Sequence, residues 1–238
     1  GQFQAGDRVI TDAGTDLSQN KIVSHGQLTL LRAFQVSCNN TFARLALELT
    51  DAKLRRTAEA LGFNVNFLFR DLVVENSSYP TTNRTEREVA WTGAGQSALL
   101  VTPMHLCMIA SAVANDGMMM EPALLLRAVS PAGRERAAFT PRAFGRVMTE
   151  ADARTLQEYM RAVVTGGTGT RAAVSGYTVC GKTGSAEIDG QENTNAWFTG
   201  FLLEEDAPYA VTVVVENAGG GGSVAAPIAG DIFKYLTQ

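Results

Sequence analysis

A change of hydrophobic pattern near residue 170 constrains the fold more than any other feature of this sequence. Before it, apolar residues recur at helical spacing, as in Phe42, Leu45, Ala46 and Leu49. After it, the segments 177–180, 196–203 and 209–216 are rich in Val, Thr, Phe and Tyr, which favours strands. A short loop joins the last two segments. Helices followed by strands predict an α+β fold, with one antiparallel sheet and helices on both of its faces.

Helix start and stop signals organise the first two thirds of the chain. We expect a first helix from Thr29, a second that carries the apolar residues above, and a third from Thr50 to Gly62. Residues 63–95 lose the pattern and are interpreted as an extended surface excursion. Thr102-Pro103 begins a helix that is apolar on nearly all sides and ends at Gly117, so it should be buried.

The remaining helices close the predicted fold. A capping box at Thr149 to Asp152 opens a helix that continues to Gly166. After the strands, a glycine run at 219–222 leads to a final amphipathic helix whose apolar stripe is Ile228, Ile232 and Leu236. Because no repeat or linker interrupts this order, we expect residues 1–238 to belong to one domain.

Composition excludes several classes of function. The formal charge of −4 argues against nucleic acid, which recruits proteins through a basic face. The apolar runs are too short for a membrane span, and residues 1–18 lack the apolar core of a signal peptide. Three cysteines and two histidines at wide spacing predict neither a disulfide framework nor a metal site. We expect no metal and no cofactor.

The run Lys182-Thr183-Gly184-Ser185 follows directly on the first predicted strand. A lysine and two hydroxyls beside a glycine can recognise an anion, and the missing side chain of Gly184 would let a substrate backbone approach the strand. A peptide could then add to this edge, with its carboxylate held by Lys182, Thr183 and Ser185. The alternative is a surface turn with a solvated lysine.

A second polar run, Ser37-Cys38-Asn39, separates the first two predicted helices. Ser37 could shuttle a proton while Asn39 holds a substrate carbonyl. The alternative is that Ser37 only caps the N-terminus of the helix that follows.

Two other signals are weaker. The glycine-rich segment 166–170 follows a helix, whereas a phosphate-binding loop needs a strand before it. Cys180 stands near Lys182, whose charge could lower the pKa of the thiol, but a core position on the strand is favoured.

The two polar runs occur in the order that serine transpeptidases and β-lactamases share: S-x-x-K, then S-x-N, then K-T-G. The surrounding segments resemble those of the class B penicillin-binding proteins, the monofunctional transpeptidases of peptidoglycan synthesis. They are His25-Gly26, Gly95-Gln96, 101–104, 114–117, 181–187, 196–198 and 225–228. The resemblance spans residues 25–236 and implies a β-lactamase/transpeptidase-like fold without its N-terminal portion. Residues 1–238 would then form the C-terminal part of a penicillin-binding transpeptidase domain.

The nucleophile of that family is missing from the expected place. It lies in a P-x-S-x-x-K helix several tens of residues before S-x-N, which would put it before Gly1. The single S-x-x-K string, Ser18-Gln19-Asn20-Lys21, is too near Ser37 and has polar neighbours, so we interpret it as a coincidence. We expect this chain alone to be inactive.

The resemblance implies roles for the candidate residues. In a D,D-transpeptidase, Ser37 and Lys182 would relay protons, Asn39 would orient the acyl amide, and the backbone N–H of Ser185 would complete the oxyanion hole. Thr183, Gly184 and Ser185 would bind the substrate.

The resemblance also implies partners and a location. The partners would be peptidoglycan stem peptides and β-lactams, with a glycosyltransferase of the cell-wall machinery as a further candidate. The location would be the outer face of the bacterial cytoplasmic membrane, with an N-terminal anchor outside these residues. The alternative functions are a non-catalytic β-lactam sensor or interaction domain and a class D β-lactamase.

Overall fold

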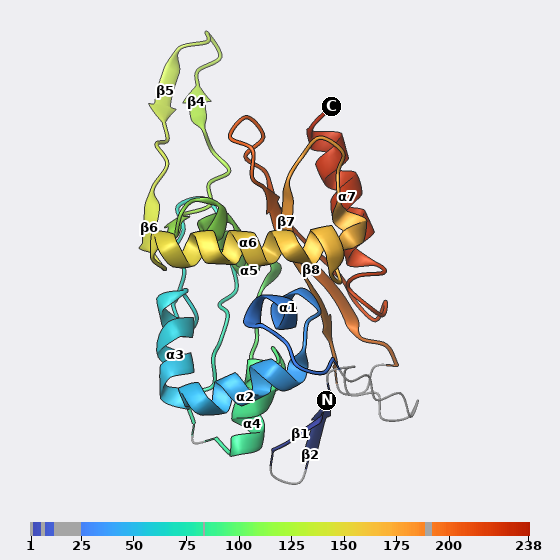
Figure 1. Cartoon of the computed structure of the whole chain (residues 1–238). Coiled ribbons are helices and arrows are strands. Elements are labelled where there is room, and N and C mark those ends of the chain that lie inside the picture. Colours follow the sequence, from blue (N-terminus) through green and yellow to red (C-terminus); the bar gives the residue numbers. More distant parts are fainter. Residues whose placement is uncertain (1, 6–7, 12–24, 83, 189–191) are drawn as a thin grey trace.

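The computed structural model describes residues 2–5, 8–11, 25–82, 84–188 and 192–238. Its helices are α1 (Leu30–Gln35), α2 (Asn39–Leu49), α3 (Asp51–Ala60), α4 (Glu86–Gly93), α5 (Pro103–Ala114), α6 (Glu150–Gly166) and α7 (Ala225–Leu236). Its strands are β1 (Gln2–Ala5), β2 (Arg8–Thr11), β3 (Met118–Met120), β4 (Arg127–Val129), β5 (Glu135–Ala138), β6 (Ala143–Arg146), β7 (Val179–Ala186), β8 (Asn195–Leu202) and β9 (Ala210–Val215). Figure 1 shows α1–α4 on one side of the long α6 and the hairpin β4–β5 on the other.

The C-terminal third forms one antiparallel sheet in the order β7-β8-β9. Lys182 lies opposite Thr199, and Ala196 lies opposite Val215, so the ladder is regular across both pairs. The prediction that these segments are neighbours in one antiparallel sheet is confirmed. Since β7 is an outer strand of this sheet, its second edge is not paired with another of its strands.

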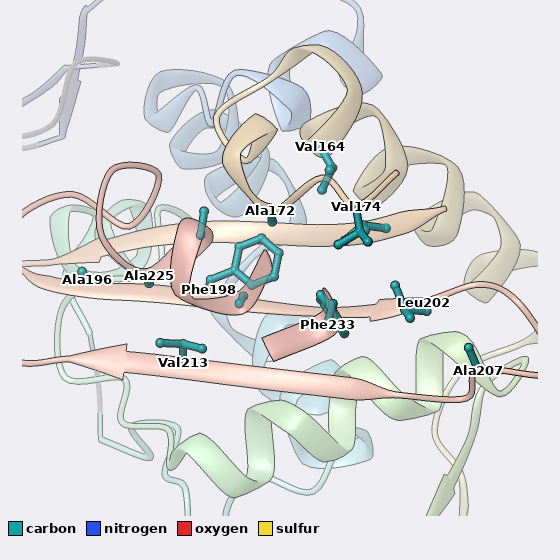
Figure 2. Packing of buried hydrophobic residues seen from close by; sticks show 13 residues of the cluster. Val164, Ala172, Val174, Ala196, Phe198, Leu202, Ala207, Val213, Ala225 and Phe233 are labelled. Carbon is teal, nitrogen blue, oxygen red and sulfur yellow. The ribbon is translucent and has the colours of Figure 1, made fainter. Parts of the chain in front are cut away.

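Helices cover both faces of this sheet, as predicted. On one face, Cys180 and Phe201 pack against α5 and α6 in a cluster with Ala110, Val113 and Met160. On the other face, Phe198 and Val213 pack against α7, together with Phe233 (Figure 2). Side chains on a strand alternate between faces, so Cys180 and Lys182 share the α5/α6 face, whereas Thr183 and Ser185 share the α7 face.

The final helix buries a different stripe from the one predicted. Ile228, Ile232 and Leu236 are 40%, 37% and 36% exposed. The buried face consists of smaller residues and one ring: Ala225, Ala226, Ala229, Gly230 and Phe233. Small residues let α7 lie close to its neighbours, and a Cβ added to Gly230 would stand 2.9 Å from the carbonyl oxygen of Arg171. The prediction assumed that the largest apolar side chains would be buried. In the structure, small residues are buried because they allow the helix backbone to lie close to its neighbours.

The predicted excursion at 63–95 contains a helix, which corrects the sequence interpretation. Helix α4 starts with a capping box in which Thr85 and Glu88 bond each other's backbone N–H groups. The segment before it is held by Arg84, whose side chain is only 3% exposed and pairs with Asp51 at 3.1 Å. The Tyr79 hydroxyl donates to the same carboxylate at 2.9 Å. A buried polar network therefore replaces the apolar periodicity that the sequence lacks here.

Other sequence predictions are confirmed. Thr102 and Thr149 cap α5 and α6 with their side chains. Cys180 is fully buried, and burial raises the pKa of its thiol to about 12, so the core interpretation holds. The short strands β3–β6 between α5 and α6 were not predicted. Within the described ranges, no helix is both long enough and apolar enough to cross a bilayer.

Candidate active site

Ser37 occupies a strained position at the end of α1. The N–H of Ser37 bonds the carbonyl of Phe34 at 3.2 Å, and the N–H of Cys38 bonds the carbonyl of Ala33 at 2.9 Å. This pair of bonds is a Schellman motif, in which the residue at the Ser37 position is left-handed and usually glycine. Ser37 adopts φ 57° there. A serine at such a position costs on the order of 1 kcal/mol, which points to a use for its side chain.

The Ser37 side chain meets Lys182 across the site. The Lys182 Nζ donates to the Ser37 Oγ at 2.8 Å, although 145 positions separate the two residues. The same ammonium donates to the carbonyl of Thr183 at 2.9 Å and lies 5.7 Å from the centre of the Phe34 ring. The N-cap of α2 is Cys38, not Ser37. The capping interpretation of Ser37 is therefore wrong.

Burial makes Lys182 an unusual lysine. Removal from water disfavours the charged form and lowers the pKa of its ammonium from 10.5 to about 8. A pKa near 8 leaves both protonation states accessible close to neutral pH. Lys182 can thus give or take a proton through the Ser37 hydroxyl, which is the chemical requirement for general acid–base work.

Thr183 and Ser185 lie on the opposite face of β7 from Lys182, and each contacts a glycine-rich segment, 166–170 for Thr183 and 219–222 for Ser185. The Oγ atoms of Thr183 and Thr168 are 2.5 Å apart. The N–H of Gly221 donates to the Ser185 Oγ at 3.1 Å. A Cβ on Gly221 would stand 2.2 Å from the carbonyl oxygen of Gly184, so the run at 219–222 packs directly on this strand. The three candidate anion-binding side chains therefore do not all converge on one face.

Asn39 is the first residue of α2 and is half-buried. Its side chain begins two residues after Ser37, on the helix that starts at the site. The Ser18-Gln19-Asn20-Lys21 string lies outside the described residues. The expectation of an open gap beside Ser37 and Lys182, where a nucleophile helix would fit, stays a prediction.

Sequence reasoning missed three residues near the site. Gln35 fastens the end of α1 to α6, because its Nε2 donates to the carbonyl of Ala162 at 2.9 Å and its carbonyl accepts from the N–H of Thr168 at 3.3 Å. Thr168, in the glycine-rich segment set aside above, contacts Thr183. Gln96 donates through Nε2 to the carbonyl of Ser185 at 3.2 Å. None of the three belongs to a motif that chemistry alone would single out.

Comparison with known proteins decides the family. The model of the penicillin binding protein transpeptidase domain matches residues 3–234. The chain belongs to the penicillin-binding protein transpeptidase family. The class B resemblance is confirmed by curated relatives such as Stage V sporulation protein D of Bacillus subtilis, which is 33% identical over 88% of this chain and 34% of the relative. Peptidoglycan D,D-transpeptidase PbpA of Mycolicibacterium smegmatis is 31% identical over 84% of this chain and 42% of the relative.

Solved structures support the same fold. The D,D-transpeptidase domain of a peptidoglycan glycosyltransferase from Eggerthella lenta matches with a TM-score of 0.87 and 27% identity, over all of this chain and 58% of that one. PBPA from Mycobacterium tuberculosis matches with a TM-score of 0.80 and 26% identity, over 89% of this chain and 52% of that one. The chain thus spans less than two thirds of these transpeptidases, and about a third to two fifths of the curated relatives.

Proposed function

We propose that this chain supplies the S-x-N and K-T-G portion of a D,D-transpeptidase site that cross-links peptidoglycan. The observation that carries the proposal is the bond from the Lys182 Nζ to the Ser37 Oγ, which joins the two motifs across 145 positions. The names of the curated relatives, which include peptidoglycan D,D-transpeptidases, support the same reaction. Residues 1–238 would act as one part of a single transpeptidase domain.

The proposed reaction has two steps. A serine hydroxyl from an S-x-x-K helix outside these residues attacks the carbonyl of the penultimate D-alanine of a stem peptide, and its proton passes to the lysine of that helix. The C–N bond to the terminal D-alanine breaks, an ester forms, and the leaving amine takes a proton from the Ser37–Lys182 pair. The amine of a neighbouring stem then attacks the ester and loses its proton to the same pair. The cross-link forms as the serine oxygen leaves and takes its proton back from the lysine of its own helix.

The other candidate residues would hold the acyl donor. The N–H of Ser185 would bond the developing oxyanion, and Asn39 would bond the acyl amide. Thr183, Gly184 and Ser185 would bind the donor peptide along β7. β-Lactams would be trapped at the ester stage. A site at the outer face of the cytoplasmic membrane and a cell-wall glycosyltransferase as partner are consistent with this substrate.

The test uses two polypeptides and a fluorescent penicillin. Residues 1–238 alone should form no adduct in intact-mass measurement, because loss of the nucleophile costs about a millionfold in turnover. The same residues preceded by a segment with an S-x-x-K helix should be labelled on the serine of that helix. In this longer polypeptide, Lys182→Ala should slow acylation by about 10²–10⁴-fold, while Lys234→Ala on the surface of α7 should not.

Two results would count against the proposal. Labelling of residues 1–238 alone, on Ser18 or Ser37, would place the nucleophile within this chain. A longer polypeptide that folds and is not labelled would favour an inactive sensor or interaction domain.

A further inference from the structure

The outer edge of β7 is the place where a substrate strand would add. Backbone groups along an antiparallel strand alternate in direction from one residue to the next. The carbonyls of Thr183 and Ser185 accept bonds from Lys182 and Gln96, not from β8, so both point to the outer edge. The N–H and carbonyl of Ser185 are therefore the pair that an added strand would use at this position.

Gln96 already bonds one group of that pair, the carbonyl of Ser185. Its Nε2 donates to the Ser185 carbonyl at 3.2 Å, across 89 positions of sequence. A side-chain amide has the same N–H group as a peptide bond, so Gln96 takes the position of a substrate N–H. Gln96 is half-buried, and Ser185 is exposed. The acceptor at the substrate edge is thus engaged by the protein's own amide.

The turn that carries Gln96 is well fixed. Gly95, with φ 80°, follows the end of α4, and the N–H of Gln96 bonds the carbonyl of Trp91 at 3.0 Å. Helix α4 itself is pressed on α2, since a Cβ on Gly93 would stand 2.4 Å from the carbonyl oxygen of Phe42. Only the Gln96 side chain therefore needs to move to expose the Ser185 carbonyl.

We propose that Gln96 is a displaceable latch on the acceptor edge of β7, which the acyl-donor peptide must release in order to bind. The inference rests on the proposed function. In an antiparallel ladder, two opposed residues exchange both of their backbone bonds. A penultimate D-alanine whose carbonyl reaches the N–H of Ser185 therefore offers its own N–H to the Ser185 carbonyl, in place of Gln96.

The latch lowers affinity slightly, because every ligand that reaches the Ser185 carbonyl must first break the Gln96 bond. A donor with an N–H at this position exchanges one hydrogen bond for another. A ligand without that N–H would break the Gln96 bond and leave the Ser185 carbonyl unsatisfied, which is the more costly outcome. Removing Gln96 should therefore tighten binding of the peptide by about 2- to 10-fold, which is the net worth of one hydrogen bond.

The experiment titrates the 238-residue chain with diacetyl-L-lysyl-D-alanyl-D-alanine and follows ¹⁵N NMR signals. In the wild type, binding should shift the side-chain amide signals of Gln96 together with the backbone signal of Ser185. Gln96→Ala should bind the tripeptide about 2- to 10-fold more tightly. Ser97→Ala, on the same turn, is the matched control and should bind as the wild type does. A depsipeptide with an ester oxygen in place of the penultimate D-alanine N–H must displace Gln96 too, so it should also gain about 2- to 10-fold from Gln96→Ala, while binding more weakly than the tripeptide to both proteins.

Three results would overturn the latch. Equal or weaker binding of the tripeptide by Gln96→Ala is the first. Binding to the wild type with unmoved Gln96 signals is the second. The third is absence of binding to either protein while the longer polypeptide is labelled by penicillin, which refutes the latch and leaves the proposed function standing. Failure of the labelling itself counts against the proposed function.

Discussion

The two sides of the site are positioned by different means. On the sheet side, Lys182 follows Gly181, where a Cβ would stand 2.3 Å from the Phe198 ring. On the helical side, Ser37 sits on a strained turn that Gln35 fastens to α6 through hydrogen bonds. Close packing of the strand positions Lys182, whereas hydrogen bonds and a strained turn position Ser37. Damage to the sheet side should therefore cost stability, whereas damage to the helical side should alter geometry with little loss of stability.

The largest expected effect concerns packing on the sheet side. Gly181→Ala would push a methyl group into Phe198 and should lower the free energy of unfolding by about 3 kcal/mol, measured by urea denaturation. Gly184→Ala is the graded control, because its Cβ would meet only the Trp197 side chain at 3.2 Å. It should cost about 1 kcal/mol. Equal costs for the two variants would contradict the claim that close approach at Gly181 fixes the strand.

The next effect comes from the buried ammonium. The folded pKa of Lys182 is about 8 against 10.5 for an ordinary lysine. Between these values Lys182 binds more protons in the unfolded chain, so its own contribution to stability should rise with pH from about 8 to 10.5. Cys180, whose pKa is raised from 9.0 to about 12, works against this rise above pH 9, so the effect of Lys182 is the difference between the wild type and a variant without it. Below pH 8 the full penalty is present. Lys182→Met should remove this rise and raise the free energy of unfolding at pH 7 by about 1–3 kcal/mol, a range that allows for the lost hydrogen bonds.

Urea denaturation at pH 7, 8.5 and 10 measures this effect in both proteins. Lys234→Met, which changes an exposed lysine of α7, is the control and should keep the wild-type slope. If Lys182→Met shows the same change of unfolding free energy with pH as the wild type, the pH dependence comes from other groups.

A smaller effect separates strain from bonding on the helical side. Ser37→Ala keeps the left-handed strain and loses the bond to Lys182, whereas Ser37→Gly loses the bond and relieves the strain. Ser37→Gly should therefore be more stable than Ser37→Ala by about 1 kcal/mol. Thermal or urea denaturation of the pair measures the difference. Equal stabilities would mean that the turn is not strained.

The smallest effect tests the corrected face of α7. Ile232 is apolar but 37% exposed, so Ile232→Gln should change the free energy of unfolding by no more than about 0.5 kcal/mol. Ala229→Gln, on the buried face of the same helix, is the matched comparison and should cost several times more. A large loss from Ile232→Gln would restore the stripe that the sequence predicted.

The sequence predicted what local chemistry encodes. The caps at Thr102 and Thr149 and the antiparallel pairing of the last three strands follow from periodicity and turn residues, and they are confirmed. The predicted buried face of α7 was wrong. An alanine buries little apolar area, so its contribution to packing depends on how closely the neighbouring sheet approaches, which the sequence does not show. Helix α4 was missed although Thr85 and Glu88 form a capping box, because the surrounding segment has no apolar stripe.

The site divides in the same way. Ser37 and Lys182 were named from motif order, and the structure places them 2.8 Å apart. Gln35, Thr168 and Gln96 were given no role, because each acts through a contact with a group on another segment of the chain. The sequence around a side-chain amide or hydroxyl contains no pattern that predicts such a contact. Residue chemistry thus predicts the candidate site residues better than the groups that position them.

The separation of 145 positions between Ser37 and Lys182 also sets an order of events in time. Closing a chain loop of that length costs roughly 4 kcal/mol in entropy. A single hydrogen bond contributes about 1–3 kcal/mol and cannot bear that cost alone. The bond can therefore form only after the sheet and α1 have docked independently of it, late in the folding of the chain. Partly folded forms of the chain would then lack the contact between Ser37 and Lys182, which would be present only in the fully folded molecule.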